Sequence, residues 1–248
     1  MAIITVSREL GSSGYVVAAR AAEILGYEFM DRQVIASISL ITRVPEDIIA
    51  KCDEVCDGPS KAFVERLIHD YPTLSSFRKL LNLDNYYTDG AVSQTYQSRM
   101  EGVVTPLDKN PLLRSVLSSS EKVEAKVKWE CAHEKYRHYL EMAIRELAKA
   151  DNLVFIGRAT QIILRDLPNA FHVRVIAPLE VRVKKAMELM KASESEATAM
   201  IKETDANRKK FIMESYNVDW ADPFLYDMIL NTGRVDVENA ARAVAQLV

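Results

Sequence analysis

The sequence has few cysteines, no long apolar run and no excess of positive charge. Three cysteines among 248 residues are typical of a reduced cytoplasmic protein rather than a secreted one held by disulfides. No apolar run approaches the ~18 residues that a membrane-spanning helix needs, so we expect no membrane partner. The formal net charge of −3 gives no bulk basicity, so we expect no nucleic-acid partner either.

Two further absences concern targeting and metal binding. The apolar part of the opening "MAIITVSREL" is too short for a signal peptide, so we again expect a cytoplasmic location. Cys52 and Cys56 are spaced to share a helix face, but no second pair of ligands stands near them in the sequence. Buried or idle thiols are therefore the better interpretation, and we assign no residue to a metal.

What the sequence does contain is an alternation of short strand-like and longer helical segments. Strands are predicted at 2–6, 27–31, 152–157, 170–177 and 226–232, and helices at 12–25, 32–42, 45–55, 133–150, 158–167, 178–191, 193–216 and 236–248. This order predicts an α/β fold of three layers, in which helices cover both faces of a parallel sheet. With 48% hydrophobic residues, the chain can build the core of a single domain over residues 1–248.

The middle of the chain does not follow this alternation. The stretches "DGPS", "YPTL", "NYYTDG" and "TPLDKNPL" break residues 57–128 into short pieces. We interpret this segment as a helical excursion from the core that forms a cap, an acceptor-side segment or an interaction surface. The sequence leaves open whether the protein is a homo-oligomer.

The loop after the first predicted strand has features of a phosphate site. Its residues Gly11, Ser12, Ser13 and Gly14 precede a predicted helix, and the unpaired N–H groups and dipole of a helix start attract anions. The common phosphate-loop pattern G-x-x-x-x-G-K-[ST] would place its lysine at Gly14. The lysine and the hydroxyl that follows it are therefore absent, and an ordinary tight turn is the alternative interpretation.

Charged side chains follow several of the predicted strands. Arg8, Arg158 and Arg182 each follow a predicted strand, whereas Arg208 lies within the predicted helix 193–216 and is expected near the same edge of the sheet. Parallel sheets bind ligands at the carboxyl ends of their strands, and the guanidinium fork matches phosphate oxygens in pairs. The nearby carboxylates are Asp31, Asp205 and Asp222. They can hold Mg²⁺, orient the arginines or receive a hydroxyl proton, and the alternative for every one of these groups is an ordinary salt bridge or surface charge.

The tryptophan and histidines receive no catalytic role. Trp220 lies in "NVDWADP", a rigid turn before the last predicted strand, where a packing role is favoured over base stacking. The four histidines are scattered, and His133 and His138 are not spaced to share one helix face.

Three stretches resemble the cytidylate kinase-like family, a divergent branch of the nucleoside monophosphate kinases in the P-loop NTPase fold. They are "ITVSRELGSSGYVVAARAAEILGYEFMDRQVI", "VFIGRATQIILRDLPNAFHVRVIAPLEVRV" and "IKETDANRKKFIMESYNVDWADPFLYDMILNT". The resemblance implies a kinase that uses ATP and Mg²⁺ to transfer the γ-phosphoryl group to a nucleoside monophosphate such as CMP. It also implies a lid-like helical segment over residues 180–215.

The resemblance further implies roles for individual residues, which fall into three groups. The groups are Gly11, Ser12, Ser13 and Gly14 in the phosphate loop, Asp31, Arg32 and Arg158 beside the acceptor nucleotide, and Arg158, Arg182, Asp205 and Arg208 in catalysis. Asp205 and Arg208 match the end of the lid motif "RDxxDxxR", whose first arginine reads Ile201 here. Ser37 replaces an acceptor-side arginine, and Tyr15 stands where this branch usually has an arginine in its loop.

These departures leave the chemistry open. Phosphoryl transfer depends on positioning and on neutralising charge, and loss of one such donor typically lowers the rate by about 10²–10³. An active kinase therefore needs a substitute cation, and we expect Arg8 to be catalytic because it lies nearest to the loop in sequence. There are two alternatives. The first is a catalytically silent relative that binds either a nucleotide or, through residues 57–128, a protein partner. The second is an interaction domain that binds no ligand.

Overall fold

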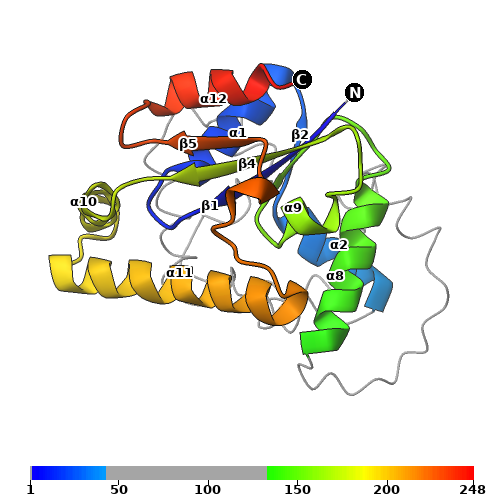
Figure 1. Ribbon diagram of the computed structural model, residues 1–248, viewed down its shortest axis with the longest axis horizontal. Helices are drawn as coiled ribbons and strands as arrows, with labels where there is room; N and C mark the ends of the chain where they lie inside the picture. The colour runs from blue at the N-terminus through cyan, green and yellow to red at the C-terminus, as the bar shows by residue number, and fades with distance from the viewer. Residues whose placement is uncertain (1, 43–132) are drawn as a thin grey trace, which may run out of the picture.

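The structure is a computed structural model that describes residues 2–42 and 133–248 (Figure 1). Its sheet has the strand order β2-β3-β1-β4-β5, and every neighbouring pair is parallel. The strands are β1 Ile3–Arg8, β2 Glu28–Met30, β3 Leu153–Ile156, β4 Ala170–Ile176 and β5 Met228–Asn231. β1 therefore occupies the centre of the sheet, and all of its residues are buried.

Helices lie on both faces of this sheet (Figure 1). They are α1 Gly14–Leu25, α2 Arg32–Thr42, α8 His133–Leu147, α9 Thr160–Ile163, α10 Leu179–Met190, α11 Glu194–Tyr216 and α12 Val237–Ala245, with a 3₁₀ helix η4 at Pro223–Leu225. α1 and α12 cover one face, whereas α2, α8 and α9 cover the other. The predicted three-layer α/β fold is confirmed.

Two hydrophobic cores arise because successive strand side chains point to opposite faces. Ile4 and Val6 of β1 pack into the core beneath α1 and α12, whereas Ile3 packs into the core beneath α2 and α8. All three are fully buried, and each such side chain contributes about 1.5–3 kcal/mol of burial free energy. Small side chains, including Ala240 and Ala241, let α12 lie close against α1.

Several helix ends follow signals that are visible in the sequence. Gly26 ends α1 with a φ of 66° and donates its N–H back to the last turn, as a left-handed C-cap residue does. Ser193 and Glu196 form a capping box at the start of α11. Asp236 caps α12 by accepting a hydrogen bond from the Asn239 N–H.

One predicted helix is wrong in extent. Residues 158–167 were expected to be helical, but α9 spans Thr160–Ile163 alone. Arg158 and Ala159 both have a φ of 54°, which a right-handed helix does not accommodate. The predicted helix at 45–55, the excursion at 57–128 and the three cysteines lie outside the described residues.

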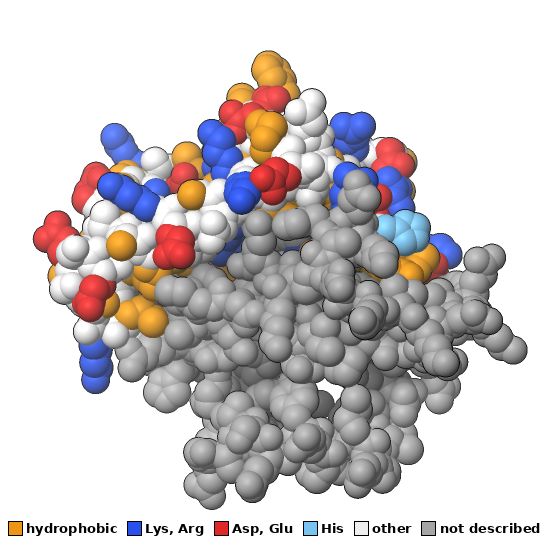
Figure 2. Space-filling model, turned by 90° about the horizontal axis from the view of Figure 1, so that it is seen from below, with side chains coloured by type: hydrophobic (Ala, Val, Ile, Leu, Met, Phe, Trp, Pro, Cys, Tyr) orange, Lys and Arg blue, Asp and Glu red, His pale blue; other side chains and the backbone are white. Residues whose placement is uncertain are grey.

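The described surface carries charge of both signs. Figure 2 shows basic and acidic side chains interspersed over the described part of one face. Within residues 2–42 and 133–248, no helix is long and apolar enough to cross a bilayer. The single-domain assignment and the absence of a nucleic-acid partner stay predictions.

Candidate functional site

Two loops diverge at the carboxyl edge of the sheet, between the neighbouring strands β1 and β3. β1 continues into α1 on one face, whereas β3 continues into α9 on the other. Such a divergence opens a crevice in which parallel sheets bind ligands. This crevice contains a pocket of about 30 Å³ whose lining includes Arg8, Arg158, Gln161, Arg208 and Trp220.

The loop after β1 is braced from within by Ser12. The Ser12 Oγ lies 2.8 Å from the Glu9 carbonyl oxygen and 3.1 Å from the Val175 carbonyl oxygen, both of which accept. The Thr232 Oγ1 donates to the Ser12 carbonyl oxygen at 2.6 Å. Ser13 has a φ of 64° and leads into α1. The Ser12 hydroxyl thus holds the loop against β4.

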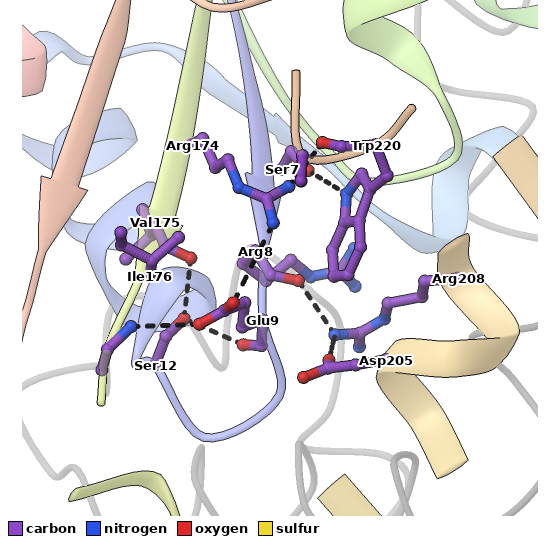
Figure 3. A network of polar contacts seen from close by, with 12 residues as sticks. Ser7, Arg8, Glu9, Ser12, Arg174, Val175, Ile176, Asp205, Arg208 and Trp220 are labelled. Carbon is purple, nitrogen blue, oxygen red and sulfur yellow. Dashed lines mark hydrogen bonds and ion pairs between the residues drawn. The ribbon is translucent and has the colours of Figure 1, made fainter. Parts of the chain in front are cut away.

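Side chains of α10 and α11 hold the same loop from outside. Arg182 Nη1 donates to the Leu10 carbonyl oxygen at 3.2 Å and to Asp205 Oδ2 at 2.5 Å. Asp205 Oδ1 accepts from the Leu10 N–H at 2.9 Å, and Arg208 Nη1 donates to the Arg8 carbonyl oxygen at 3.0 Å (Figure 3). The structure therefore brings Arg182, Asp205 and Arg208 together at the loop, as the sequence predicted.

Glu9 and Trp220 extend this network toward β4 (Figure 3). The Glu9 carboxylate lies 3.5 Å from Arg182 Nε and 4.0 Å from Arg174 Nη2. The Arg174 guanidinium stacks 4.3 Å from the centre of the Trp220 ring, and Trp220 Nε1 donates to Ser7 Oγ at 2.7 Å. The packing role predicted for Trp220 is confirmed, since its side chain belongs to a hydrophobic core.

Arg8 lies between the two loops. It is buried, and a Cβ added to Gly157 would stand 1.9 Å from Arg8 Nη1. Because a side chain at position 157 would displace the guanidinium, and because Gly157 has a φ of 69°, glycine lets Arg8 lie against the backbone of the loop after β3. Arg8 is thus placed at the crevice.

The loop after β3 holds its shape through an unusual backbone. Gly157, Arg158 and Ala159 have positive φ values in succession. Each left-handed residue with a side chain costs about 1–2 kcal/mol, and such strain gathers at functional sites. The Arg158 side chain is 1% exposed and donates from Nη1 to Asp31 Oδ1 at 2.7 Å. Arg158 and Asp31 are therefore brought together, as predicted.

Tyr15 lies on α1, but its side chain contacts Asp31, the partner of Arg158 in the second loop. The Tyr15 hydroxyl donates to Asp31 Oδ2 at 3.2 Å, and the Tyr15 ring meets the edge of Phe29 at 5.3 Å. Tyr15 follows the phosphate loop in sequence, yet its side chain supports the carboxylate that pairs with Arg158. Tyr15 stands where this branch of the family usually has an arginine, and its hydroxyl contacts Asp31 on the opposite side of the crevice.

Two side chains near the predicted site residues were not predicted from the sequence. Gln161 is 1% exposed, and neither its Nε2 nor its Oε1 has a hydrogen-bond partner in the described part of the chain. Lys185 Nζ donates to Ser13 Oγ. Lys185 lies three residues after Arg182 on α10, and this spacing was the signal available for it, because residues three apart share a helix face. Gln161 had no such signal, because Arg158 precedes α9 and has a left-handed backbone.

Other residues have local roles. Asp222 accepts a hydrogen bond from the Phe224 N–H and caps η4. Ile201 is buried in the core beneath α1, and the Ser37 Oγ donates to the Gln33 carbonyl oxygen at 2.7 Å. Arg32 begins α2, and its side chain lies outside the described part of the structure.

The described residues fit a nucleotide's phosphates better than a protein-held Mg²⁺. Among them there is no group of three or more His, Cys, Asp or Glu side chains that could hold a metal ion. Asp31 and Asp205 are bonded to arginines, and the Ser12 hydroxyl is bonded to carbonyls. Since Mg²⁺ requires oxygen ligands in near-octahedral array, residues 2–42 and 133–248 offer no ligand set for it, and we assign it no step.

The parallel sheet with β1 at its centre, the loop before α1 and the arginines at the carboxyl edge define a nucleotide-binding, kinase-like protein of the P-loop fold. The model of the cytidylate kinase-like family matches residues 3–234. The chain belongs to this family.

Individual relatives are more distant. A cytidylate kinase of Methanocaldococcus jannaschii is 30% identical over 105 residues, which cover 42% of this chain and 59% of that enzyme. A crystal structure of an uncharacterized protein from Eubacterium ventriosum has a TM-score of 0.57 at 18% identity, with 100% of this chain and 98% of that chain covered; it supports the fold alone. A shikimate kinase from Acinetobacter baumannii in complex with shikimate covers 100% of this chain and 92% of its own, but its TM-score of 0.41 at 12% identity carries no weight.

Proposed function

We propose that this protein transfers the γ-phosphoryl group of ATP to a nucleoside monophosphate, with CMP as the first acceptor to test. The observation that carries the proposal is that Arg8, Arg158 and Arg208 line one crevice, while Arg182 bonds to the backbone of the loop that leads from β1 to α1. In this reaction an oxygen of the acceptor phosphate forms a bond to the γ-phosphorus, and the bond to the bridging oxygen of ADP breaks. The acceptor oxygen is already anionic, so the reaction needs no general base.

The chemistry of the crevice suits such an acceptor. Two anions must be brought together and their charge neutralised, which positioned guanidinium groups do well. The phosphate loop and the residues that hold it form the donor side, and Asp31, Arg158 and Gln161 form the acceptor side.

The experiment is a turnover assay on the full chain. Purified protein is incubated with ATP, Mg²⁺ and each common nucleoside monophosphate in turn, and ADP release is measured above an acceptor-free control. We expect one acceptor to stimulate ADP release, and Arg158→Gln to reduce that stimulation by about 10²-fold or more. The matched control is Arg165→Gln, a neighbouring arginine that the site does not use, which should retain turnover.

The alternative outcome of this assay is nucleotide binding without turnover. The missing lysine of the loop and the inward-facing hydroxyl of Ser12 favour a silent relative that binds nucleotide without turnover. Nucleotide-dependent thermal stabilisation with no acceptor-stimulated ADP release would establish it and refute the kinase. Neither binding nor turnover would leave an interaction domain. A cytoplasmic location and a homo-oligomer stay proposals that fractionation and sedimentation can test.

A further inference from the structure

The loop before α1 lacks a lysine of its own, but a lysine from elsewhere in the chain reaches it. Lys185 lies on α10, and its Nζ donates to the Oγ of Ser13 in the loop. The two residues are 172 positions apart in sequence. Lys185 is partly buried, whereas its neighbour Lys184 is exposed on the same helix. The fold thus directs one of two adjacent lysines to the phosphate loop.

Arg182 fixes the position of α10 against this loop. Its Nε donates to the Ala177 carbonyl oxygen at 3.0 Å, and its Nη1 donates to the Leu10 carbonyl oxygen at 3.2 Å. The approach is close, since a Cβ added to Gly11 would stand 3.0 Å from the Arg182 Cβ. Arg182 and Lys185 are three residues apart and share a helix face. The contacts of Arg182 therefore hold Lys185 beside the loop.

The electrostatics of this position favour an anion. Ser13 is the N-cap residue of α1 but its side chain makes no capping hydrogen bond, and the first turn of α1 contains no acidic residue. The start of a helix carries partial positive charge, so an ammonium group beside it is disfavoured. A phosphate group at the first turn would be attracted by both the N–H groups and the ammonium.

We propose that Lys185 supplies the phosphate-binding ammonium group that the loop lacks. The proposal rests on the proposed binding of a nucleotide at this loop, and it assigns to α10 a role first expected of Arg8. When a triphosphate binds, Lys185 Nζ exchanges the Ser13 hydroxyl for oxygens of the terminal phosphates. The ammonium then neutralises charge that builds up on those oxygens during transfer.

The test compares Lys185→Gln with Lys184→Gln in the full chain. The two substitutions remove the same charge from adjacent positions of one helix. Affinity for ATP and for inorganic tripolyphosphate is measured by calorimetry at constant ionic strength, and the thermal midpoint of each ligand-free variant is recorded. Loss of a charge-assisted hydrogen bond should weaken both ligands by about 10–100-fold in Lys185→Gln. Lys184→Gln should stay within about twofold of the wild type, because screening makes exposed charges weak.

A third variant separates a functional role from a structural one. Lys185→Arg keeps the positive charge, so it should restore part of the affinity for tripolyphosphate that Lys185→Gln loses. An affinity of Lys185→Gln within about twofold of the wild type would overturn the proposal and leave the proposed kinase standing. Equal losses in Lys185→Gln and Lys185→Arg, together with a lower thermal midpoint, would also overturn it. Failure of the wild type to bind ATP would refute both the proposed kinase and the proposed role of Lys185. Binding of ATP without turnover, if Lys185→Gln still weakens it, would support the role of Lys185 and refute the kinase.

Discussion

The loops after β1 and β3 meet at one crevice but are held in different ways. The loop after β1 is tied by distant side chains, because Arg182, Asp205 and Arg208 bond to its backbone groups. The loop after β3 is held by its own left-handed backbone and by the short pair between Arg158 and Asp31. Movement of α10 and α11 would therefore loosen the first loop, whereas the pair between Arg158 and Asp31 involves neither of these helices.

If the proposed transfer takes place, this difference indicates that the two halves of the site can be controlled separately. The ties to the first loop come from the segment expected to act as a lid, residues 180–215, now seen as α10 and α11. Movement of these helices would alter the contacts of the proposed donor side directly. Whether they move stays a prediction, and the following substitutions probe the two loops in order of expected effect.

The largest effect is expected from Asp205→Ala on the donor side. Asp205 bonds to the Leu10 N–H and to Arg182, and its side chain is 17% exposed. The substitution leaves the Leu10 N–H without its acceptor and leaves Arg182 with the more distant Glu9 carboxylate as its ion-pair partner, so the free energy of unfolding should fall by about 3 kcal/mol. Urea denaturation measures this change. The control Asp166→Ala breaks the exposed pair with Arg145 and should cost less than about 1 kcal/mol; equal losses in the two variants would contradict the comparison.

The next effect concerns Gln161 beside the second loop. Its buried amide has no hydrogen-bond partner in the described part of the chain, so Gln161→Leu should raise the free energy of unfolding of the ligand-free protein by about 1–3 kcal/mol. The same variant should bind the acceptor nucleotide more weakly and ATP unchanged. Chemical denaturation and calorimetry measure the two properties. A stability gain without any loss of acceptor affinity would remove Gln161 from the acceptor side.

A smaller effect is expected from Tyr15→Phe. The substitution removes the hydroxyl that donates to Asp31 and keeps the ring against Phe29. One hydrogen bond contributes about 1 kcal/mol, so acceptor affinity should fall by about fivefold with ATP affinity unchanged. The comparison variant Tyr27→Phe alters a tyrosine outside the crevice. If Tyr15→Phe weakened ATP rather than the acceptor, Tyr15 would belong to the donor side after all.

The smallest effect concerns the sheet interior that supports both loops. His172 of β4 lies with its Nδ1 2.8 Å from Thr5 Oγ1, and burial lowers the pKa of His172 below its usual value, which Asp227 offsets in part. The unfolded chain binds a proton near pH 6.5, whereas folded His172 does so at lower pH. The contribution of His172 to the free energy of unfolding is therefore fully present above about pH 6.5 and is lost as the pH falls below that value.

Urea midpoints at pH 7 and pH 5 measure this effect of His172. His172→Gln should show a smaller decline than the wild type over that interval, because the titrating group is gone. His138→Gln serves as the control, since His138 is an exposed histidine on α8. An unchanged decline in His172→Gln would assign the pH dependence to other groups.

Much of the architecture was predictable from local patterns. The apolar segments gave the five strands within a few residues, and Gly26 ended its helix as predicted. The position of Arg8, Arg158 and Arg182 at one edge of the sheet was predictable because the carboxyl ends of parallel strands share that edge, whereas Asp205 and Arg208 lie inside α11, to which this rule does not apply, and the resemblance was the guide to them. The start of α9 was not, because Arg158 and Ala159 adopt left-handed backbone that their residue types do not signal.

The sequence by itself determined the fold class, the family and the absence of a lysine in the loop, because alternation and motif spacing are local properties of a chain. Only the tertiary structure decided what occupies the place of that lysine. The sequence pointed to Arg8, whereas the packing of α10 against the loop brings Lys185 to Ser13. Tertiary contacts likewise turned Tyr15 toward Asp31. Such assignments depend on which helix faces pack together, and residues far apart in the chain carry no local pattern that fixes them.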